Sequence, residues 1–151
     1  MENGSILRIS PALYDRLNEI EDLTSNPNAR VWRSDVEKGI RMTYAYEAAG
    51  QFLAEVSLVT EIDDPDYVIP HVRAYLSHLL VKKECRGQGI GKTLVDFICA
   101  KAKALGYREI SLGVDKDNEA ALHLYRAKGF DRVLYEGEDE YGPFYKLLKT
   151  L

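Results

Sequence analysis

The sequence predicts a mixed α/β fold, in which a central, mostly antiparallel sheet of about six or seven strands carries helices on both faces. Three observations predict it: strand-length apolar runs recur along the chain, amphipathic helical segments lie between several of them, and the first half contains a hairpin pattern. With 151 residues, of which 46% are hydrophobic, the chain has the size and core content of one domain, predicted over residues 1–151.

The predicted strands show either alternation or continuous apolar character. Residues 40–46 alternate, Gly50 follows, and residues 52–60 are apolar and β-branched, which is typical of a β-hairpin. Residues 72–81 are apolar on both faces, as in a central strand. The other predicted strands are 6–9, 109–114, 130–135 and 141–148, the last two forming a hairpin around an acidic loop at 136–140.

The predicted helices combine apolar stripes with start and stop signals. Ser10 followed by Pro11 is a common helix start, Asn118 suits the N-cap of a helix that runs to about Lys128, and Gly106 and Gly129 suit helix ends. The stretch before Gly39 favours neither helix nor strand. The residues at helical spacing are Leu13, Leu17, Ile20 and Leu23 in the first helix, and Ile90, Leu94, Phe97, Ile98, Ala102 and Leu105 in the second.

Composition excludes several classes of protein. With 20 Lys and Arg against 24 Asp and Glu, the net charge is −4, which argues against a nucleic-acid binder. No apolar run approaches the ~20 residues of a membrane span, and the N-terminus lacks the pattern of a signal peptide. Cys85 and Cys99 are too few for a disulfide scaffold or a four-ligand zinc site. We therefore expect a cytoplasmic protein without a metal, a membrane partner or a nucleic-acid partner.

The sharpest local feature is the glycine-rich segment Arg86-Gly-Gln-Gly-Ile-Gly-Lys92, which lies between a predicted strand and a predicted helix. Glycines let the backbone turn tightly and approach a ligand, and the first turn of a helix offers free N–H groups to an anion. Residues 82–108 contain seven bases and two acids, a local charge of 7 − 2 = +5 in an acidic protein. This segment is therefore a predicted polyphosphate site.

Three kinds of phosphate site compete for this segment. A dinucleotide-binding fold needs Gly-x-Gly-x-x-Gly, but Lys92 stands where the third glycine is required. A P-loop for nucleoside triphosphates is matched at its end by Gly91-Lys92-Thr93, with Asp115 as a metal-binding acid, but Arg86 replaces its first glycine. The acyl-coenzyme A pattern Gln/Arg-x-x-Gly-x-Gly/Ala is matched by Arg86, Gly89 and Gly91, while a glycine-rich helix start without any ligand remains open.

Two linked motifs resemble the GNAT superfamily of acetyl-coenzyme A-dependent N-acetyltransferases. The first runs from Leu79 through the glycine-rich segment to Leu94, and the second runs from Val114 to Phe130. The resemblance covers most of the chain. It implies a GNAT-like fold and transfer of an acetyl group from acetyl-CoA to a primary amine, by direct attack in a ternary complex.

The resemblance also implies which residues hold acetyl-CoA. The backbone of one strand pairs with the pantetheine arm, the glycine-rich loop and the helix after it hold the pyrophosphate, and the second motif touches the pantetheine amides. The matching residues are Leu79, Leu80 and Val81 on the strand, Arg86, Gly87, Gln88, Gly89, Ile90, Gly91, Lys92 and Thr93 at the loop, and Asn118, Ala121 and Tyr125 in the second motif.

Tyr125 matches the family's general acid. It lies seven residues, or two helical turns, after Asn118, so both residues and Ala121 face the same side of the predicted helix. A phenol beside the sulfur can donate a proton to the departing thiolate. The other interpretation is a core tyrosine that packs under the sheet.

The general base is harder to assign. Family members often carry a glutamate on the strand that ends at Val81, and this strand has none. Glu55 lies on the neighbouring strand among apolar residues, where burial would raise its pKa, so we predict Glu55 as the base. Glu47, His78 and a chain of water molecules are the alternatives.

The resemblance implies that the acceptor is an amine-bearing small molecule or peptide. Acidic segments at residues 61–66 and 136–140 favour a cationic acceptor, although they are also consistent with ordinary solvated loops. Candidate aromatic lining residues are Trp32, Tyr44 and Tyr46. A non-catalytic acyl-CoA-binding regulatory module and, less well supported, a P-loop nucleotide-binding enzyme are the alternative functions. The oligomeric state is left open, with a homodimer as one option.

Overall fold

A computed structural model describes residues 4–151 and contains a seven-stranded mixed sheet in the order β1-β2-β3-β4-β5-β7-β6. Strands β4 and β5 pair in parallel, and the pairs β1–β2, β5–β7 and β6–β7 are antiparallel. The strands are β1 Ser5–Arg8, β2 Arg41–Ala48, β3 Gln51–Val59, β4 Arg73–Val81, β5 Glu109–Asp115, β6 Arg132–Asp139 and β7 Gly142–Thr150. The predicted fold class is confirmed, and 72–81 is a central strand.

Within residues 4–151, three α-helices and three 3₁₀ helices accompany the sheet. They are α1 Ala29–Lys38, α2 Ile90–Ala104 and α3 Glu119–Ala127, with η1 Pro11–Glu19, η2 Leu23–Ser25 and η3 Lys83–Cys85. Among the described residues, no helix is long and apolar enough to cross a membrane.

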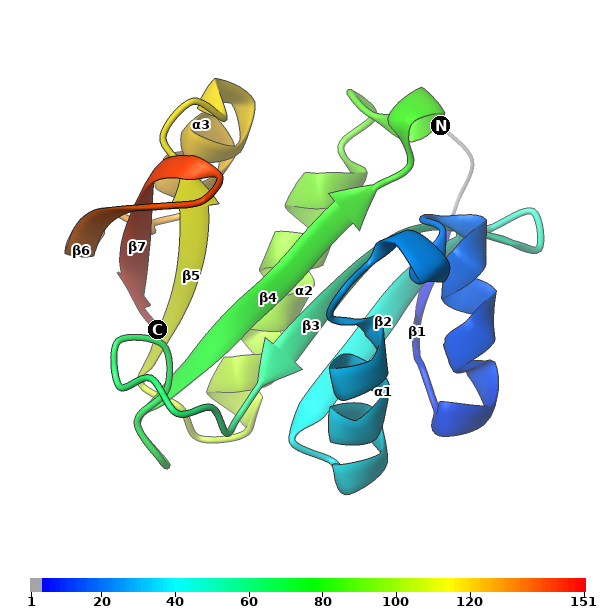
Figure 1. The fold of residues 1–151 in the computed structure, drawn as a ribbon, viewed down its shortest axis with the longest axis horizontal. Helices are drawn as coiled ribbons and strands as arrows, with labels where there is room; N and C mark the ends of the chain where they lie inside the picture. Colours follow the sequence, from blue (N-terminus) through cyan, green and yellow to red (C-terminus); the bar gives the residue numbers. More distant parts are fainter. Residues whose placement is uncertain (1–3) are drawn as a thin grey trace. The chain divides into compact units, whose positions relative to one another are not determined.

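The chain folds as two compact units. The first unit contains the residues up to Leu58 together with His78–Val95, and the second contains Val59–Ser77 with Asp96–Leu151. In the first unit, α1 lies against β2, as Figure 1 shows. The buried cluster there consists of Ile9, Tyr14, Leu17, Val36, Ala45 and Phe52.

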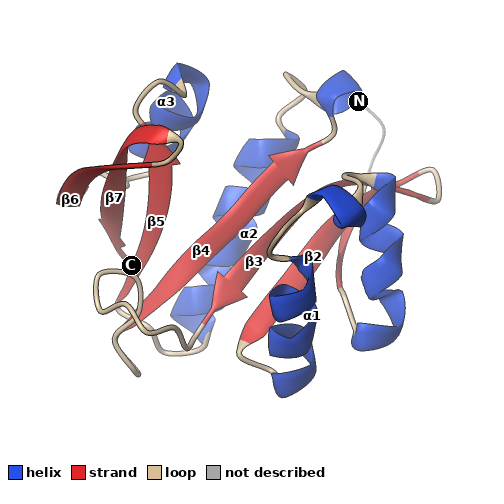
Figure 2. Ribbon diagram, in the orientation of Figure 1, coloured by secondary structure: helices blue, strands red, loops and turns tan. Residues whose placement is uncertain are grey.

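The second unit contains β5, β6 and β7 with α3 (Figure 2). Strand β7 pairs with β5 on one side and with β6 on the other. Its successive residues Leu147 and Leu148 point to opposite faces of the sheet, and both are buried. Arg73 at the start of β4 is also buried, and its guanidinium donates to the Glu109 carboxylate at 2.9 Å and to the carbonyls of Pro65 and Asp66. These bonds fix the segment that precedes β4.

Several elements differ from the sequence prediction in detail. Leu105 was assigned to the buried stripe of α2, but it is 48% exposed, because α2 ends at Ala104 and Gly106 turns the chain with φ +95°. The acidic residues 136–139 belong to β6 rather than to a loop, since β6 and β7 stay paired up to Asp139 and Gly142. Residues 41–46 are buried on both faces instead of alternating, because β1 and β3 flank β2 in the sheet and α1 covers it.

Candidate active site

The glycine-rich loop joins η3 to α2 through two left-handed residues. Gly87 has φ +80° and Gly89 has φ +85°, a region that residues with a side chain rarely adopt. A Cβ atom placed on either glycine would meet no other atom within 4 Å, so the space beside the loop is open. The glycines therefore serve the turn, and they also leave the backbone accessible.

The start of α2 determines which amide groups are available to a ligand. The Thr93 amide and hydroxyl both donate to the Gly89 carbonyl, at 3.1 and 3.0 Å. The helical hydrogen-bond ladder therefore begins at Thr93, and the amides of Ile90, Gly91 and Lys92 precede it without an intrahelical acceptor. Thr93 was predicted to contribute its amide to the phosphate site, but that amide is engaged within the helix.

Basic side chains surround this loop. Arg86 is exposed, and its Nε donates to the carbonyl of Val81 at 3.0 Å, which anchors the side chain at the end of β4. Lys92 is exposed on the first turn of α2. Gln88 and Gly87 are exposed, whereas Ile90 is buried and fixes the helix to the core. The loop thus combines open backbone amides with positive charge.

The end of β4 carries the residues predicted to pair with a pantetheine arm. Leu79, Leu80 and Val81 are all half-buried, and the amide of Lys82 donates to the Leu53 carbonyl of β3 at 2.8 Å. His78 has φ +56°, a left-handed conformation inside a strand. Such a residue costs about 1–3 kcal/mol and is held by its surroundings. It marks a local irregularity near the end of β4.

His78 lies between two carboxylates in the first unit. Its Nε2 atom is 3.6 Å from Glu55 Oε1 and 3.7 Å from Glu21 Oε2. The Trp32 ring packs on the imidazole with a centroid distance of 4.8 Å, and the Arg41 guanidinium lies 4.0 Å from the centre of the Trp32 ring. The structure therefore brings two predicted candidates for the base, Glu55 and His78, into one cluster.

Burial shifts the protonation of this cluster in two directions. Burial raises the pKa of Glu55 to about 7; the charge of Glu21 adds to the rise and that of Arg41 opposes it. Burial, helped by the charge of Arg41, lowers the pKa of His78 to about 4. Near neutral pH the imidazole is therefore neutral and Glu55 is close to half ionised, so the predicted burial and raised pKa of Glu55 are confirmed. Glu47, by contrast, pairs with Arg16 at 3.5 Å.

Helix α3 in the second unit carries the other predicted site residues. The Asn118 side chain accepts from the Ala121 amide at 3.2 Å, which confirms its predicted N-cap role. Tyr125 is buried, and its ring meets Phe130 edge-on with 5.9 Å between the ring centres. Burial, with a smaller effect of Tyr75, raises the pKa of Tyr125 to about 12, so the phenol keeps its proton at neutral pH. His123 is exposed on the same helix.

The acidic segments of the second unit are partly neutralised. Lys146 Nζ lies 2.9 Å from Asp64 Oδ2 and 3.1 Å from Asp66 Oδ2, and Lys116 forms an ion pair with Glu136. Half of the acids within 61–66 therefore have a lysine partner. This weakens the sequence argument that these segments attract a cationic acceptor.

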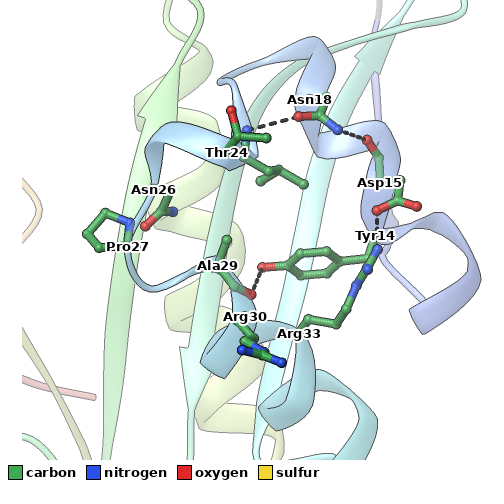
Figure 3. Close-up of a pocket in the computed structure, with 10 residues that line it drawn as sticks. Tyr14, Asp15, Asn18, Thr24, Asn26, Pro27, Ala29, Arg30 and Arg33 are labelled. Carbon is green, nitrogen blue, oxygen red and sulfur yellow. Dashed lines mark hydrogen bonds and ion pairs between the residues drawn. The ribbon is translucent and has the colours of Figure 1, made fainter.

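A pocket of about 380 Å³ lies in the first unit among η1, η2 and the start of α1 (Figure 3). Its polar side chains are bonded to their neighbours. The Tyr14 hydroxyl donates to the Ala29 carbonyl at 3.3 Å, Arg33 pairs with Asp15, and the Asn18 amide donates to the Asp15 carbonyl at 3.0 Å. Because these bonds tie the short helices together, we interpret the pocket as part of their packing. Within residues 4–151, no group of three His, Cys, Asp or Glu residues is placed to hold a metal ion.

Comparison with known proteins gives the family. The model of the acetyltransferase (GNAT) family matches residues 12–130, which is more than half of the chain. The chain belongs to this family. This chain resembles a mycothiol acetyltransferase from Geodermatophilus obscurus, with 32% identity over 120 residues, 70% of this chain and 39% of that relative. It therefore spans well under two thirds of that relative's length. A peptidyl-lysine N-acetyltransferase, YjaB, from Salmonella typhimurium is 28% identical over 80% of this chain and 86% of its own.

The fold of this chain also matches solved structures. A GNAT family acetyltransferase from Elizabethkingia anophelis, solved with acetyl-CoA bound, superimposes with a TM-score of 0.75 at 17% identity, over 100% of each chain. The family and the fold class predicted from the sequence are confirmed.

Sequence reasoning missed two members of the cluster around His78. Glu21 lies in the turn between η1 and η2, and nothing in its spacing connects it with Glu55 on β3. Arg41 is a charged residue that the structure buries at the start of β2, and its sequence position alone did not indicate this. Trp32 was predicted to line the acceptor site, and it lies against His78.

Proposed function

We propose that this acetyltransferase moves an acetyl group from acetyl-CoA to a primary amine by direct attack in a ternary complex. One observation carries the proposal: a glycine-rich loop with two left-handed residues immediately precedes α2. This loop lies in the part of the chain that the acetyltransferase (GNAT) family model matches, together with both predicted motifs. A P-loop enzyme is disfavoured, because Arg86 stands at the first glycine position.

The residues around the loop fit a pyrophosphate. The amides of Ile90, Gly91 and Lys92 precede the helical ladder, Arg86 and Lys92 are exposed, and the space beside Gly87 and Gly89 is open. We propose that these groups hold the pyrophosphate, that the backbone of 79–81 pairs with the pantetheine arm, and that Asn118 and Ala121 contact its amides. Thr93 would fix the start of α2 through its two bonds to the Gly89 carbonyl rather than offer a free amide.

Acetyl-CoA, when bound, supplies a thioester whose acetyl carbon is open to attack by an amine. Glu55 takes one proton from the incoming ammonium, which frees the nitrogen lone pair. Backbone N–H groups of 79–81 donate to the carbonyl oxygen as it gains negative charge. Tyr125 donates its phenolic proton to the departing thiolate and regains one from the attacking nitrogen. In total, ammonium and thioester give amide, thiol and one released proton.

The acceptor is proposed only as a class, an amine-bearing small molecule or peptide. The relatives named above have names that point to different acceptors, a mycothiol acetyltransferase in one case and a peptidyl-lysine N-acetyltransferase in the other. Because Lys146 and Lys116 neutralise part of the acidic segments, the charge of the acceptor stays open. The cytoplasmic location and the homodimer remain predictions from the sequence.

The test is a binding and activity comparison on the same preparation. Coenzyme A should raise the melting temperature, because a ligand that binds only the folded state stabilises it, whereas ATP with magnesium should have little effect. A panel of small amines, amino acids and peptides with acetyl-CoA should then release free thiol with at least one acceptor. Coenzyme A binding without thiol release from any acceptor would favour the regulatory module. A larger shift with ATP would contradict the family function.

A further inference from the structure

We infer that His78 and Glu21 form, with Glu55, a proton relay that carries the proton of the acceptor amine from the buried base to solvent. The inference rests on the proposed function, and it adds two residues that the proposed chemistry does not use. In the relay, Glu55 passes the proton to Nε2 of His78, and the imidazolium passes it to Glu21.

The reaction requires such an exit. Each turnover converts an ammonium and a thioester into an amide and a thiol, so one proton must leave the protein. Glu55 takes that proton, but its side chain is only 7% exposed, so water has little direct access to it. If Glu55 stayed protonated, it could not act as the base in the next turnover.

The geometry provides a route of increasing exposure. The exposed fraction of the side chain rises from 7% at Glu55 to 22% at His78 and 29% at Glu21. The same Nε2 atom of His78 lies 3.6 Å from one carboxylate and 3.7 Å from the other, so a proton received from Glu55 is already beside Glu21. Both gaps are slightly longer than a hydrogen bond, and catalytic hydrogen bonds commonly shorten when the substrate complex forms.

The surroundings hold the imidazole in place. The Trp32 ring packs on it, and the left-handed backbone of His78, with φ +56°, places this residue in a conformation that a regular strand would not give. Among charged and titratable groups, Arg41 lies across Trp32 and disfavours the imidazolium, whereas the two carboxylates favour it. Tyr14 is buried nearby, and its pKa is raised above the ordinary value, chiefly by burial and then by Glu55, so it stays neutral.

The protonation states allow the relay to run. With pKa values of about 4 for His78 and about 7 for Glu55, the proton resides on Glu55 about 10³ times more often than on the imidazole. The imidazolium therefore forms only transiently. The neutral imidazole therefore accepts the proton and releases it without becoming a trap.

The test is His78→Asn, assayed with the acceptor that the amine panel identifies. Asn tolerates left-handed backbone and keeps a polar side chain, but it cannot carry a proton. In weak buffer we expect steady-state turnover to fall by roughly tenfold or more, the scale of a lost proton-transfer group. In a single-turnover experiment at pH 8, Glu55 is already ionised before the variant meets its substrates. The rate of that first turnover should therefore stay near the wild-type rate. Added imidazole should restore steady-state turnover, because a small base can replace the relay.

Three further variants make the outcome decisive. His123→Asn, on the exposed face of α3, is the matched control and should match wild type. Glu21→Gln should show the same buffer-dependent loss as His78→Asn, and it keeps the test valid if the His78 variant fails to fold. Glu55→Gln should lose the single-turnover rate as well, without rescue. Wild-type turnover in both relay variants, or a loss that imidazole does not restore, would overturn the relay, whereas a fully active Glu55→Gln enzyme would overturn the proposed base itself.

Discussion

Glu55 and His78 lie 3.6 Å apart, and burial shifts their pKa values in opposite directions. Each shift favours the neutral form of its own group, so at pH 5–6 the pair is stable as a neutral acid beside a neutral imidazole. The sequence suggested Glu55, because it lies among apolar strand residues. It did not reveal Glu21 or the orientation of His78, because both depend on a turn and a backbone irregularity that bring distant segments together.

These opposite shifts predict how stability depends on pH. Glu55 binds its proton more tightly in the folded state, with a pKa of about 7 against 4.5, so its contribution falls by about 3 kcal/mol as pH rises from 4.5 to 7. His78 binds its proton less tightly when folded, about 4 against 6.5, so its contribution rises by about 3 kcal/mol between pH 4 and 6.5. In the wild type the two slopes should largely cancel.

Urea unfolding at pH 5.0 and 6.5 separates the two contributions. In Glu55→Gln only the pH dependence due to His78 remains, so the free energy of unfolding should increase from pH 5.0 to pH 6.5. In His78→Asn only the pH dependence due to Glu55 remains, so the free energy of unfolding should decrease from pH 5.0 to pH 6.5. Parallel pH dependence in the two variants would show that burial does not shift these groups as described.

At the scale of elements, the first turn of α2 and the loop before it form one functional piece. Sequence reasoning located this loop well, because glycine spacing and the change from strand to helix are both local signals. It did not predict that the Thr93 amide and hydroxyl would close on the Gly89 carbonyl, since the position where a helical ladder starts depends on the exact cap. The sequence also did not predict helix α1 or the 3₁₀ form of η1, because tertiary packing rather than local helix propensity decides both.

The loop glycines allow a controlled substitution. Gly89→Val and Gly106→Val both place a branched side chain at positive φ, +85° and +95°, with no neighbouring atom within 4 Å of the new Cβ. Both variants should therefore lose a similar amount of stability, about 1–3 kcal/mol. Only Gly89→Val should also lose coenzyme A affinity, by more than tenfold in a calorimetric titration, because its side chain enters the space beside the open amides. Equal affinity in the two folded variants would mean that Gly89 serves the turn alone.

At the scale of the whole molecule, the sequence predicted the order of strands and helices because each long element has its own periodic pattern. The strand order β1-β2-β3-β4-β5-β7-β6, with its parallel pair β4–β5, needed the three-dimensional structure, since pairing joins residues such as Ala74 and Ile110 that lie far apart in the chain. The ion pairs of Lys146 were hidden for the same reason. Local motifs thus indicate the chemistry, and the fold determines which charges remain free.

The most direct test of the account is the pH dependence of kcat/KM for acetyl transfer, compared between the wild type and Glu55→Gln. A base must be ionised to accept the amine proton, so the wild-type value should fall below a pKa of about 7, tenfold for each pH unit. In Glu55→Gln, kcat/KM should be strongly reduced, and its decrease below a pH of about 7 should disappear. If the same decrease of kcat/KM at low pH persisted in the variant, it would come from the amine or from another residue. That result would contradict Glu55 as the base.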